Sequence, residues 1–516
     1  MYTTALVWLL LTPLILSLLI FATRWLGHAG IRLAEILHLI SVTAVLVFSL
    51  MVVGGVLTQG PLFAMNDWFH VDALAAVFLL VIGVVGFLVG LYTPGYIRND
   101  LQVGELKEPQ ISLFYGLFEL FLFTMLLVVT ANNIFIMWVA VEATTLGSTF
   151  LVGIYGHRES LEAAWKYVIM CTVGVAFGLY GSVLLYSDAV NFITESRAGA
   201  LWTEIIKNAQ LLDPILLKMA FVFALNGFGT KAGIFPMHSW LPDAHSEAPS
   251  PVSALLSGVL LNCALFVVIR FAIILDYSKV GAELPRTIFL IFGALSVVAD
   301  AFFMFAQKDI KRLLAYSSVE NIGMILLGLG IGGPIGIMAA LLQAINHSIV
   351  KSLMFCTTGN VLMKYHTRNL EKLKGMLQVI PLTSLLLLIG ALALVGLPPL
   401  NIFISKFTII SAGFQTGHVW LMIFILLSLA VIFAAVMKVI STIALREIPE
   451  GMVKGEVKPW GLIPLAVLGA FIFLLGVYIP PQLDTLLTQA TNIVMAGQSA
   501  IANPDGLINL TKILIH

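Results

Sequence analysis

Lys231-Ala-Gly-Ile-Phe-Pro-Met-His-Ser-Trp-Leu-Pro242 is one of two stretches in which proline interrupts a long apolar run; the other reads Gly396-Leu-Pro-Pro-Leu-Asn-Ile-Phe-Ile-Ser-Lys406. Proline has no backbone N–H, so in a helix the carbonyl four residues earlier loses its partner. Hydrocarbon cannot satisfy such a carbonyl, so protein or internal water must do so. The carbonyls concerned belong to Ala232, Leu394 and Val395. Two broken helices, each with a nearby lysine, are typical of a transport site, and we expect this chain to move ions.

The composition is that of a membrane protein. Hydrophobic residues make up 60% of the 516 residues and charged residues 10%, with a mean hydropathy of +1.03; a soluble domain has about 25% charged residues. The formal net charge is zero, which argues against a nucleic-acid partner and against an acidic tail for a cationic partner. The chain is therefore expected to consist mainly of membrane spans, each of about 20 apolar residues.

Apolar runs of spanning length predict an all-α polytopic bundle of about fourteen transmembrane helices. The first run starts beside Met1–Thr4, which carries no lysine or arginine, so we expect a span and not a cleaved signal. The expected spans are 4–23, 33–58, 72–93, 111–130, 134–155, 162–187, 214–240, 250–272, 287–307, 313–331, 336–362, 379–411, 419–445 and 459–480. The tail that follows, 481–516, is expected to form a short surface helix.

The distribution of basic residues predicts the orientation, because cytoplasmic loops are enriched in lysine and arginine. Fifteen lie in one set of alternate loops, and five lie in the opposite set and the tail. The first set is Arg24, Arg32, Arg98, Lys107, Arg158, Lys308, Lys311, Arg312, Lys364, Arg368, Lys372, Lys374, Arg446, Lys454 and Lys458; the second is Arg197, Lys207, Lys279, Arg286 and Lys512. Both termini are thus expected on the outer side of the membrane.

Several ionisable residues fall inside the expected spans. Each costs about 2.5–3.5 kcal/mol at the centre of a bilayer, so a set of them implies a common purpose. The set is Glu142, Lys166, Lys231, Glu320, His347, Lys351 and Lys406. Lys218, Arg270 and Lys438 lie near span ends, where their side chains are expected to reach the interface, and we assign them no role.

The ionisable residues form two similar series. Glu142 precedes Lys231 by 89 residues, and Glu320 precedes Lys406 by 86. Each series also has a lysine on the helix after its glutamate; these are Lys166 and Lys351. The spacing indicates a duplicated five-helix unit, and because five is odd the second copy is expected to be inverted in the membrane. The expected units are 1–110 (three helices), 111–272 (first repeat), 287–445 (second repeat) and 446–516 (last helix and tail).

The chemistry of these residues suits proton movement. Burial and a neighbouring opposite charge act on protonation in opposite directions, so a buried Glu142–Lys231 pair can switch when another charge arrives. His347 lies four residues from Lys351 on one helical face with Gln343, and histidine suits a relay at neutral pH. The competing interpretation is a static ion pair between helices. Two further pairings remain open: Lys166 with Glu162, and Glu320 with Lys311 and Arg312.

Other motifs give weaker signals. His238, Asp243, His245 and Glu247 follow the first break, but their spacing fits no standard metal site; loop packing or proton entry is the better interpretation. The three cysteines, Cys171, Cys263 and Cys356, are scattered through apolar runs and are expected to be buried thiols. The glycine-rich stretch 328–334 precedes no Lys-Ser/Thr, so it does not indicate a phosphate loop. No cofactor or metal is expected.

The motifs resemble those of a known family, the antiporter-like membrane subunits of complex I, with relatives in Mrp-type cation/proton antiporters and energy-converting hydrogenases. The resemblance covers roughly residues 70–445. It rests on the stretch from Lys231 through Pro242-Asp-Ala-His245, on Ala248-Pro-Ser-Pro-Val-Ser-Ala254, on Asp309-Ile-Lys-Arg-Leu-Leu-Ala-Tyr-Ser-Ser318 and on Asn346-His-Ser-Ile-Val-Lys351. It implies a fold with broken helices 7 and 12.

The resemblance also implies roles for single residues. Glu142 is similar to the fifth-helix glutamate of the family, and Lys231 to its partner on the broken seventh helix. Lys166 resembles the sixth-helix lysine of N-type members. His347, Lys351 and Lys406 match the eleventh- and twelfth-helix residues of L-type members. His238 follows the same break and is a further candidate.

The chain departs from the family pattern at two places. Asn262 lies where members usually place a lysine or histidine that links the half-channels, so water or His347 must bridge the gap or the link is weaker. The chain stops about 36 residues after its last expected span and lacks the lateral helix of L-type members. Ser317-Ser-Val-Glu-Asn-Ile-Gly323, which contains Glu320, resembles the F-type component of hydrogenase-4 and formate hydrogenlyase complexes.

The sequence thus predicts a proton-translocating subunit without a redox site of its own, in the cytoplasmic membrane of a bacterium or archaeon. Its expected partners are membrane lipid and other membrane and peripheral redox subunits, with iron–sulfur, nickel–iron or quinone-reducing centres. Two alternatives remain: a subunit of a Mrp-type cation/proton antiporter, and a structural scaffold whose channel is silent, as Asn262 suggests.

Overall fold

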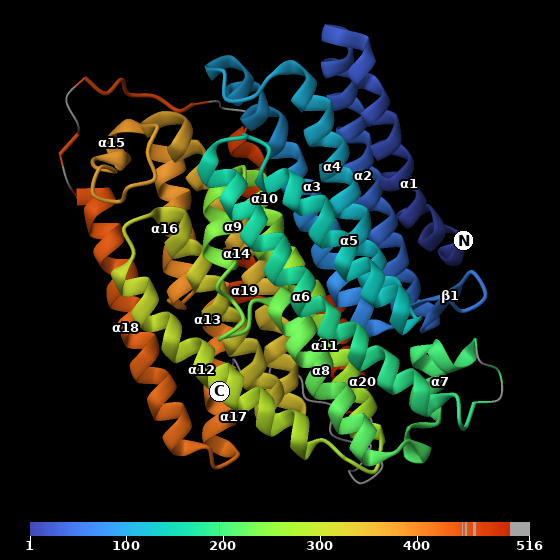
Figure 1. Ribbon diagram of the computed structural model, residues 1–516. Coiled ribbons are helices and arrows are strands. Elements are labelled where there is room, and N and C mark those ends of the chain that lie inside the picture. Colours follow the sequence, from blue (N-terminus) through green and yellow to red (C-terminus); the bar gives the residue numbers. More distant parts are fainter. Residues whose placement is uncertain (194, 196, 446, 449–450, 458–460, 496–516) are drawn as a thin grey trace.

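The computed structural model describes residues 1–193, 195, 197–445, 447–448, 451–457 and 461–495, which form a bundle of long helices (Figure 1). The helices of the first half are α1 Tyr2–Ala22, α2 Gly27–Gln59, α3 Ala73–Val103, α4 Glu108–Thr130, α5 Ile134–Val152, α6 Arg158–Ala189, α7 Trp202–Lys207, α8 Pro214–Ala232, α9 Leu241–Glu247, α10 Ser250–Leu255 and α11 Leu261–Tyr277. Those of the second half are α12 Glu283–Ala306, α13 Ile310–Ile331, α14 Gly333–Tyr365, α15 Met376–Val379, α16 Pro381–Val395, α17 Asn401–Gln415, α18 Val419–Leu445, α19 Leu462–Val477 and α20 Pro481–Met495.

Short elements connect the long helices. The 3₁₀ turns are η1 Thr23–Leu26, η2 Ala198–Ala200 and η3 Ala209–Leu211, and η4 Leu256–Leu260 is a π-helical turn between α10 and α11. An antiparallel hairpin of β1 Leu62–Ala64 and β2 Phe69–Val71 adds a small sheet that the all-α prediction did not include. In Figure 1, this hairpin lies at the right-hand side of the bundle, α7 at its lower right and α15 at its upper left.

The polytopic membrane fold is confirmed, and the number of spans stays a prediction. Among the described residues, eleven helices are long and apolar enough to cross a membrane, or twelve if α19 and α20, which meet at 71°, count as one. The segment Tyr2–Gln59 counts once although it contains both α1 and α2. With 15 residues each, α16 and α17 are too short to count singly. The expected fourteen are more numerous because they count α1 and α2 separately, α16 with α17 as one span, and α19 as one span.

Both predicted breaks are present, and a glycine ends each first half. The helix α8 stops before Gly233 and α16 before Gly396, both in the left-handed region with φ of +75° and +83°. Such a residue closes a helix at little cost when it is glycine. The chain becomes helical again in α9 and α17. The Lys406 Nζ donates to the Leu394 carbonyl at 3.0 Å, so the lysine expected beside the break satisfies one of the carbonyls that proline frees.

Arg270 differs from its prediction. It was expected to extend to the interface, but it is 1% exposed and its guanidinium donates to both carboxylate oxygens of Asp72 at 2.6 and 2.8 Å. Asp72 is also the N-cap of α3, where it accepts from the Ala75 N–H. The guanidinium carbon lies 4.1 Å from the centre of the Trp202 ring. This pair fastens α11 to the start of α3, because both charges lose a partner if either side chain moves away.

The C-terminal segment is partly different from the expected surface helix. The helix α20 buries Leu486, Leu487 and Ala490 and packs against α3 and α14. The rest of the expected tail, 496–516, lies outside the described residues, as do Arg446 and Lys458. The three cysteines are free and buried, as predicted.

Replacing Arg270 by Met should lower the melting temperature strongly. The change leaves the Asp72 carboxylate buried without its partner, and breaking a buried ion pair in this way costs about 3–5 kcal/mol. Differential scanning fluorimetry of the detergent-purified protein measures the effect. Lys218→Met, on an exposed position of α8, is the control. An equal shift for the two variants would contradict the structural role of the pair.

Stability should also fall in mild acid because of His70. Burial lowers the pKa of His70 from 6.5 to about 4, against the opposing charge of Asp72. The unfolded chain therefore binds a proton that the folded chain does not between these two values, and stability decreases as the pH falls from about 6.5 to about 4. Melting curves of His70→Phe should be flatter over this range than those of the wild type. His366→Asn, which changes an exposed histidine at a left-handed position, should keep the wild-type slope; a His70→Phe slope equal to it refutes the assignment.

Candidate ion-translocation site

Lys231 lies in the last turn of α8, fully buried. Its Nζ donates to the Thr145 hydroxyl at 2.8 Å and to the Tyr167 hydroxyl at 2.5 Å, and it lies 4.5 Å from the centre of the Tyr167 ring. The Tyr167 hydroxyl in turn bonds to Ser148 Oγ at 2.7 Å. The first broken helix therefore delivers a lysine into a cluster of neutral hydroxyl groups from α5 and α6, which can pass protons as well as hold them.

Glu142 lies three residues before Thr145, on the same face of α5. Its Oε1 accepts from the Thr172 hydroxyl at 2.8 Å, and its buried Oε2 has no hydrogen-bond partner among the described residues. Glu142 and Lys231 do not form a direct ion pair within the described structure. The acid and the base are instead linked through α5, whose Thr145 binds the lysine.

Lys166 does not join this cluster. Its side chain is 49% exposed and pairs with Glu162 at 2.7 Å and with Asp243 at 3.3 Å. Asp243 also binds Arg312 at 2.9 Å. The alternative pairing with Glu162 is therefore present, and it places Lys166 in a surface network of charges between α6, α9 and α13.

Glu320 and Lys406 form the second acid–base pair. The Lys406 Nζ lies 2.8 Å from the Glu320 Oε1, and the two side chains are 0% and 4% exposed for the acid and the base. The other Glu320 oxygen accepts from Asn321 at 2.7 Å. The alternative partners are excluded, because Lys311 donates to the Ala248 carbonyl and Arg312 binds Asp243.

A chain of buried amides and hydroxyls continues from this pair. The Asn321 side chain accepts from Gln343 at 2.6 Å, and Gln343 accepts from the Ser405 hydroxyl. Asn346 donates to the Asn401 carbonyl at 2.9 Å. From the sequence, Gln343 was noted only as a neighbour of His347, and the other members were missed. Their signal was a polar residue at helical spacing within an apolar run, which a search for ionisable groups does not detect.

His347 and Lys351 lie on the central helix α14, and both are fully buried. The Lys351 Nζ donates to the Leu314 carbonyl at 2.7 Å and to the Ser317 hydroxyl. The two ring nitrogens of His347 have no hydrogen-bond partner among the described residues. A buried polar atom without a partner costs about 1–3 kcal/mol, so His347 indicates a place for a water molecule or a proton carrier.

Asn262 connects α11 to the same part of α14. Its Nδ2 donates to the Ala344 carbonyl at 3.2 Å and to the Ser348 hydroxyl at 2.8 Å. The π-helical turn η4 ends two residues earlier, and π turns occur often at functional positions in helices. Its Oδ1 is buried without a partner among the described residues. Asn262 therefore supplies one unfilled acceptor at the centre of the bundle, against the stretch of α14 that carries His347.

His238 and its neighbours do not form a metal site. The His238 ring packs beside Phe235 and Phe303, with ring centres 5.2 and 5.9 Å away. Glu247 binds Arg368 at 2.7 Å. In the part of the chain that the structure describes, no group of three or more His, Cys, Asp or Glu side chains is placed to hold a metal ion.

A buried histidine–glutamate pair between α2 and α4 was missed entirely. His38 Nδ1 lies 2.6 Å from Glu119 Oε1, and the other carboxylate oxygen accepts from the Ser41 hydroxyl at 2.5 Å. His38 Nε2 lies 3.1 Å from the Gly90 carbonyl, which can only accept, so Nε2 must carry a hydrogen. The short contact between Nδ1 and Oε1 joins α2 to α4. Both residues were assigned to apolar runs and neither was counted as ionisable.

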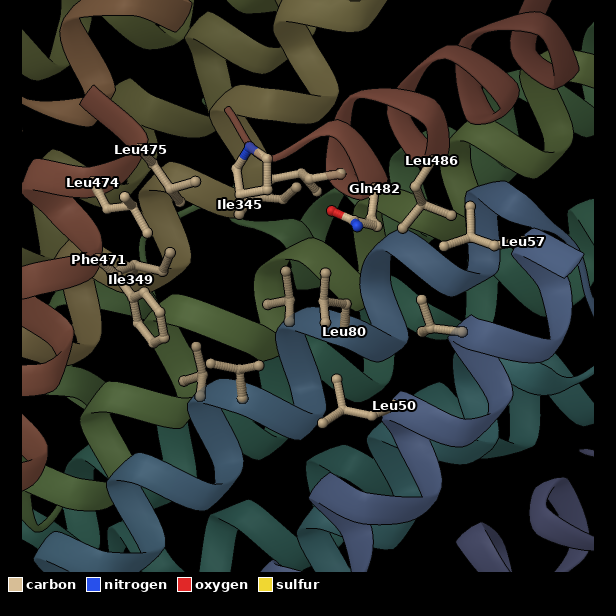
Figure 2. A pocket seen from close by; sticks show the side chains of 16 residues that line it. Leu50, Leu57, Leu80, Ile345, Ile349, Phe471, Leu474, Leu475, Gln482 and Leu486 are labelled. Atoms are coloured by element: carbon tan, nitrogen blue, oxygen red, sulfur yellow. The ribbon is translucent and has the colours of Figure 1, made fainter. Parts of the chain in front are cut away.

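The apolar pocket of Figure 2 gives a contrast to these polar clusters. It lies between α2, α3, α14, α19 and α20 and is lined by aliphatic side chains such as Leu50, Leu80 and Leu486, with Gln482 as the one amide. The central helix contributes Ile345 and Ile349, which stand on either side of His347 in sequence. The face of α14 that lines this pocket is therefore apolar, and His347 lies on another face of the helix.

Comparison with known proteins agrees with this geometry. Residues 131–434, more than half of the chain, match the family model described as NADH:quinone oxidoreductase/Mrp antiporter, TM, and residues 62–104 match NADH-Ubiquinone oxidoreductase (complex I), chain 5 N-terminus. A Hydrogenase-4 component F homolog from Methylacidiphilum infernorum is 36% identical over 419 residues, 81% of this chain and 87% of the relative.

Two further proteins extend the comparison. Hydrogenase-4 component B of Escherichia coli is 33% identical over 355 residues, 65% of this chain and 49% of the relative, so this chain spans about half of its length. A chain of the membrane-bound sulfane sulfur reductase, an archaeal respiratory membrane complex, shares the fold with a TM-score of 0.82 at 24% identity, covering 96% of this chain and 99% of that one.

The resemblance inferred from the motifs around Lys231 and Glu320 is thus confirmed. With its two broken helices and the buried lysines Lys231 and Lys406 beside them, the chain belongs to the NADH:quinone oxidoreductase/Mrp antiporter transmembrane family.

Proposed function

We propose that the protein is a proton-translocating, non-redox subunit of a membrane-bound hydrogenase or formate hydrogenlyase, or of a complex I-like assembly. The observation that carries the proposal is the pair of acid–base stations, the half-buried Glu142 with the buried Lys231, and the buried Glu320 with the buried Lys406. Together they would bind and release protons while electron transfer in partner subunits supplies the energy. The relative named Hydrogenase-4 component F homolog supports the choice of complex.

The first station binds protons through its hydroxyl cluster. A lysine that donates only to neutral hydroxyls, Thr145 and Tyr167, has no fixed counter-ion. Glu142 is the carboxylate on the helix that binds this lysine, so we propose that a change of charge on either residue alters the protonation of the other, because charges interact strongly in a low-dielectric interior. The second station differs, since Lys406 and Glu320 are in direct contact at 2.8 Å. We interpret the two arrangements as two states of one kind of station, one opened and one closed.

The central helix would connect the stations. Lys351 and His347 lie on α14, and Asn262 contacts the same helix. An asparagine cannot take up a proton, but its free Oδ1 can hold a water molecule that does. We therefore propose that water at Asn262 and the unpaired His347 ring carry protons between the halves, in place of the titratable eighth-helix residue of other members.

The equivalence of the stations also supports the proposed inverted repeat, 111–272 against 287–445. We call the end of the bundle that carries α15 and the loop lysines Lys308, Lys372 and Lys374 the basic end. We further propose that this basic end faces the cytoplasm and that both termini lie outside. The proposed partners are membrane lipid and neighbouring redox subunits.

A subunit of a Mrp-type cation/proton antiporter is the second candidate, because the matching family model covers Mrp antiporters as well as NADH:quinone oxidoreductases. Identification of the proteins that co-purify separates the two. Iron–sulfur and nickel–iron subunits would support the first proposal, and small hydrophobic antiporter subunits the second.

Lys231→Met and Glu142→Gln should each lower proton translocation by the intact complex on the order of tenfold or more, because each removes one ionisable group of the first station. The measurement is dye-reported proton uptake in proteoliposomes, normalised to electron transfer. Lys218→Met, an exposed lysine on the same helix as Lys231, is the matched control and should pump normally. Wild-type pumping by both site variants would end the proposal.

Lys406→Met should lower the melting temperature more than Lys406→Met combined with Glu320→Gln, and both variants should lose most of their pumping. The single change leaves a buried carboxylate without its cation, and such a loss costs about 3–5 kcal/mol, whereas the double change removes both charges. Thermal melting and proton flux together measure the coupling between the residues. Equal stability of the single and double variants would show that the observed contact contributes nothing.

A further inference from the structure

A cavity of about 520 Å³ lies at the basic end of the bundle, outside the translocation site. It is formed by the end of α12, the start of α13, the loop before α15 and the later half of α18. Its walls include Phe305 and Val439 on the apolar side and Gln307 and Thr442 on the polar side. The cavity therefore joins the surface of two spanning helices to the loops beyond the membrane.

Four lysines line this cavity: Lys308, Lys372, Lys374 and Lys438. One acid, Glu371, accompanies them, and it pairs with Lys308 at 3.2 Å. Among the described residues, no carboxylate lies within ion-pair distance of the other three lysines. Like charges gathered in one concave space repel each other unless an anion enters. Three of the four lysines of the cavity therefore have no carboxylate partner among the described residues.

The outer faces of α12 and α18 extend this site along the membrane. On α12, Phe302 is 69% exposed and Phe305 54% exposed, and α18 exposes Leu427 and Phe433 in the same way. The two helices pack against each other. We call the exposed apolar surface along these two packed helices the apolar seam. The Lys438 ammonium lies 5.4 Å from the centre of the Phe305 ring, so the positive charges begin where this seam ends. A ligand that matches both parts needs an anionic head and hydrocarbon chains.

We propose that the cavity binds the phosphate head group of an anionic phospholipid whose acyl chains lie along the seam between α12 and α18. Basic pockets at the cytoplasmic edge of transmembrane helices recognise such head groups. A free phosphate ion would use the lysines but leave the aromatic seam unoccupied. A zwitterionic lipid would fill the seam, but its cationic group would meet the lysines. The proposal depends on the membrane fold and not on proton translocation.

Lipid retention by the intact complex tests the proposal. The complex is delipidated in mild detergent and incubated with phosphatidylglycerol, phosphatidylcholine or inorganic phosphate, and bound lipid is measured by native mass spectrometry. We expect phosphatidylglycerol to bind more tightly than phosphatidylcholine. Lys374→Gln with Lys438→Gln should weaken that binding on the order of tenfold, since each lysine near a lipid surface adds to the attraction of an anionic head group. Lys107→Gln with Lys279→Gln makes the same charge change elsewhere and should leave it unchanged.

Further variants separate the remaining outcomes. Lys374→Arg with Lys438→Arg keeps the charges and should retain the lipid, which shows whether a loss in the glutamine variant comes from charge and not from misfolding. Equal binding of the two lipids, or equal binding by the glutamine and control variants, overturns the proposal. Displacement by inorganic phosphate at the same concentration as lipid, or cross-linking of position 438 to another protein of the complex in place of lipid, also overturns it.

Discussion

The constraint behind this structure is that hydrocarbon accepts neither a bare charge nor an unpaired backbone group. Each break and each buried ionisable residue therefore needs a partner inside the bundle. Lys406 meets both needs, because it binds Glu320 and the carbonyl of Leu394 that the break at Pro398 frees. Arg270 and Asp72 meet the same need where α11 joins the start of α3. The chain satisfies these groups incompletely at His347 and Asn262, which is where we propose that protons pass.

The apolar runs, the two breaks and the family were predictable because they depend on local properties of the sequence. Proline, glycine and hydropathy act over a few residues, so the breaks lie close to the prolines that predicted them, with α8 ending shortly before Pro236 and α16 shortly before Pro398. The partners of charged side chains were harder to predict. Glu320 lies nine residues after Lys311 on one helix, yet its partner is Lys406 on another. Arg270 was misjudged for the same reason, since Asp72 lies 198 residues away.

The candidate site shows the same division. Its ionisable residues were found from their cost in a membrane, but its neutral members were not. Thr145, Tyr167 and Gln343 look like ordinary helix residues, and only their contacts with Lys231 or Asn321 distinguish them. The pair of His38 and Glu119 was overlooked because each residue stands within a long apolar run. The contact between the two side chains gives each a polar partner inside the bundle, which offsets the cost of burying them.

The double attachment of Lys406 has a mechanical consequence. One ammonium group ties the acid on α13 to the open end of α16, while its own backbone belongs to α17. Moving α16 and α17 apart must lengthen one of these two contacts. Protonation of Glu320 would weaken its contact with Lys406, because the negative charge is lost. Conformation and charge at this point are therefore coupled, so a shift of α16 against α17 would change the electrostatic environment of the buried carboxylate.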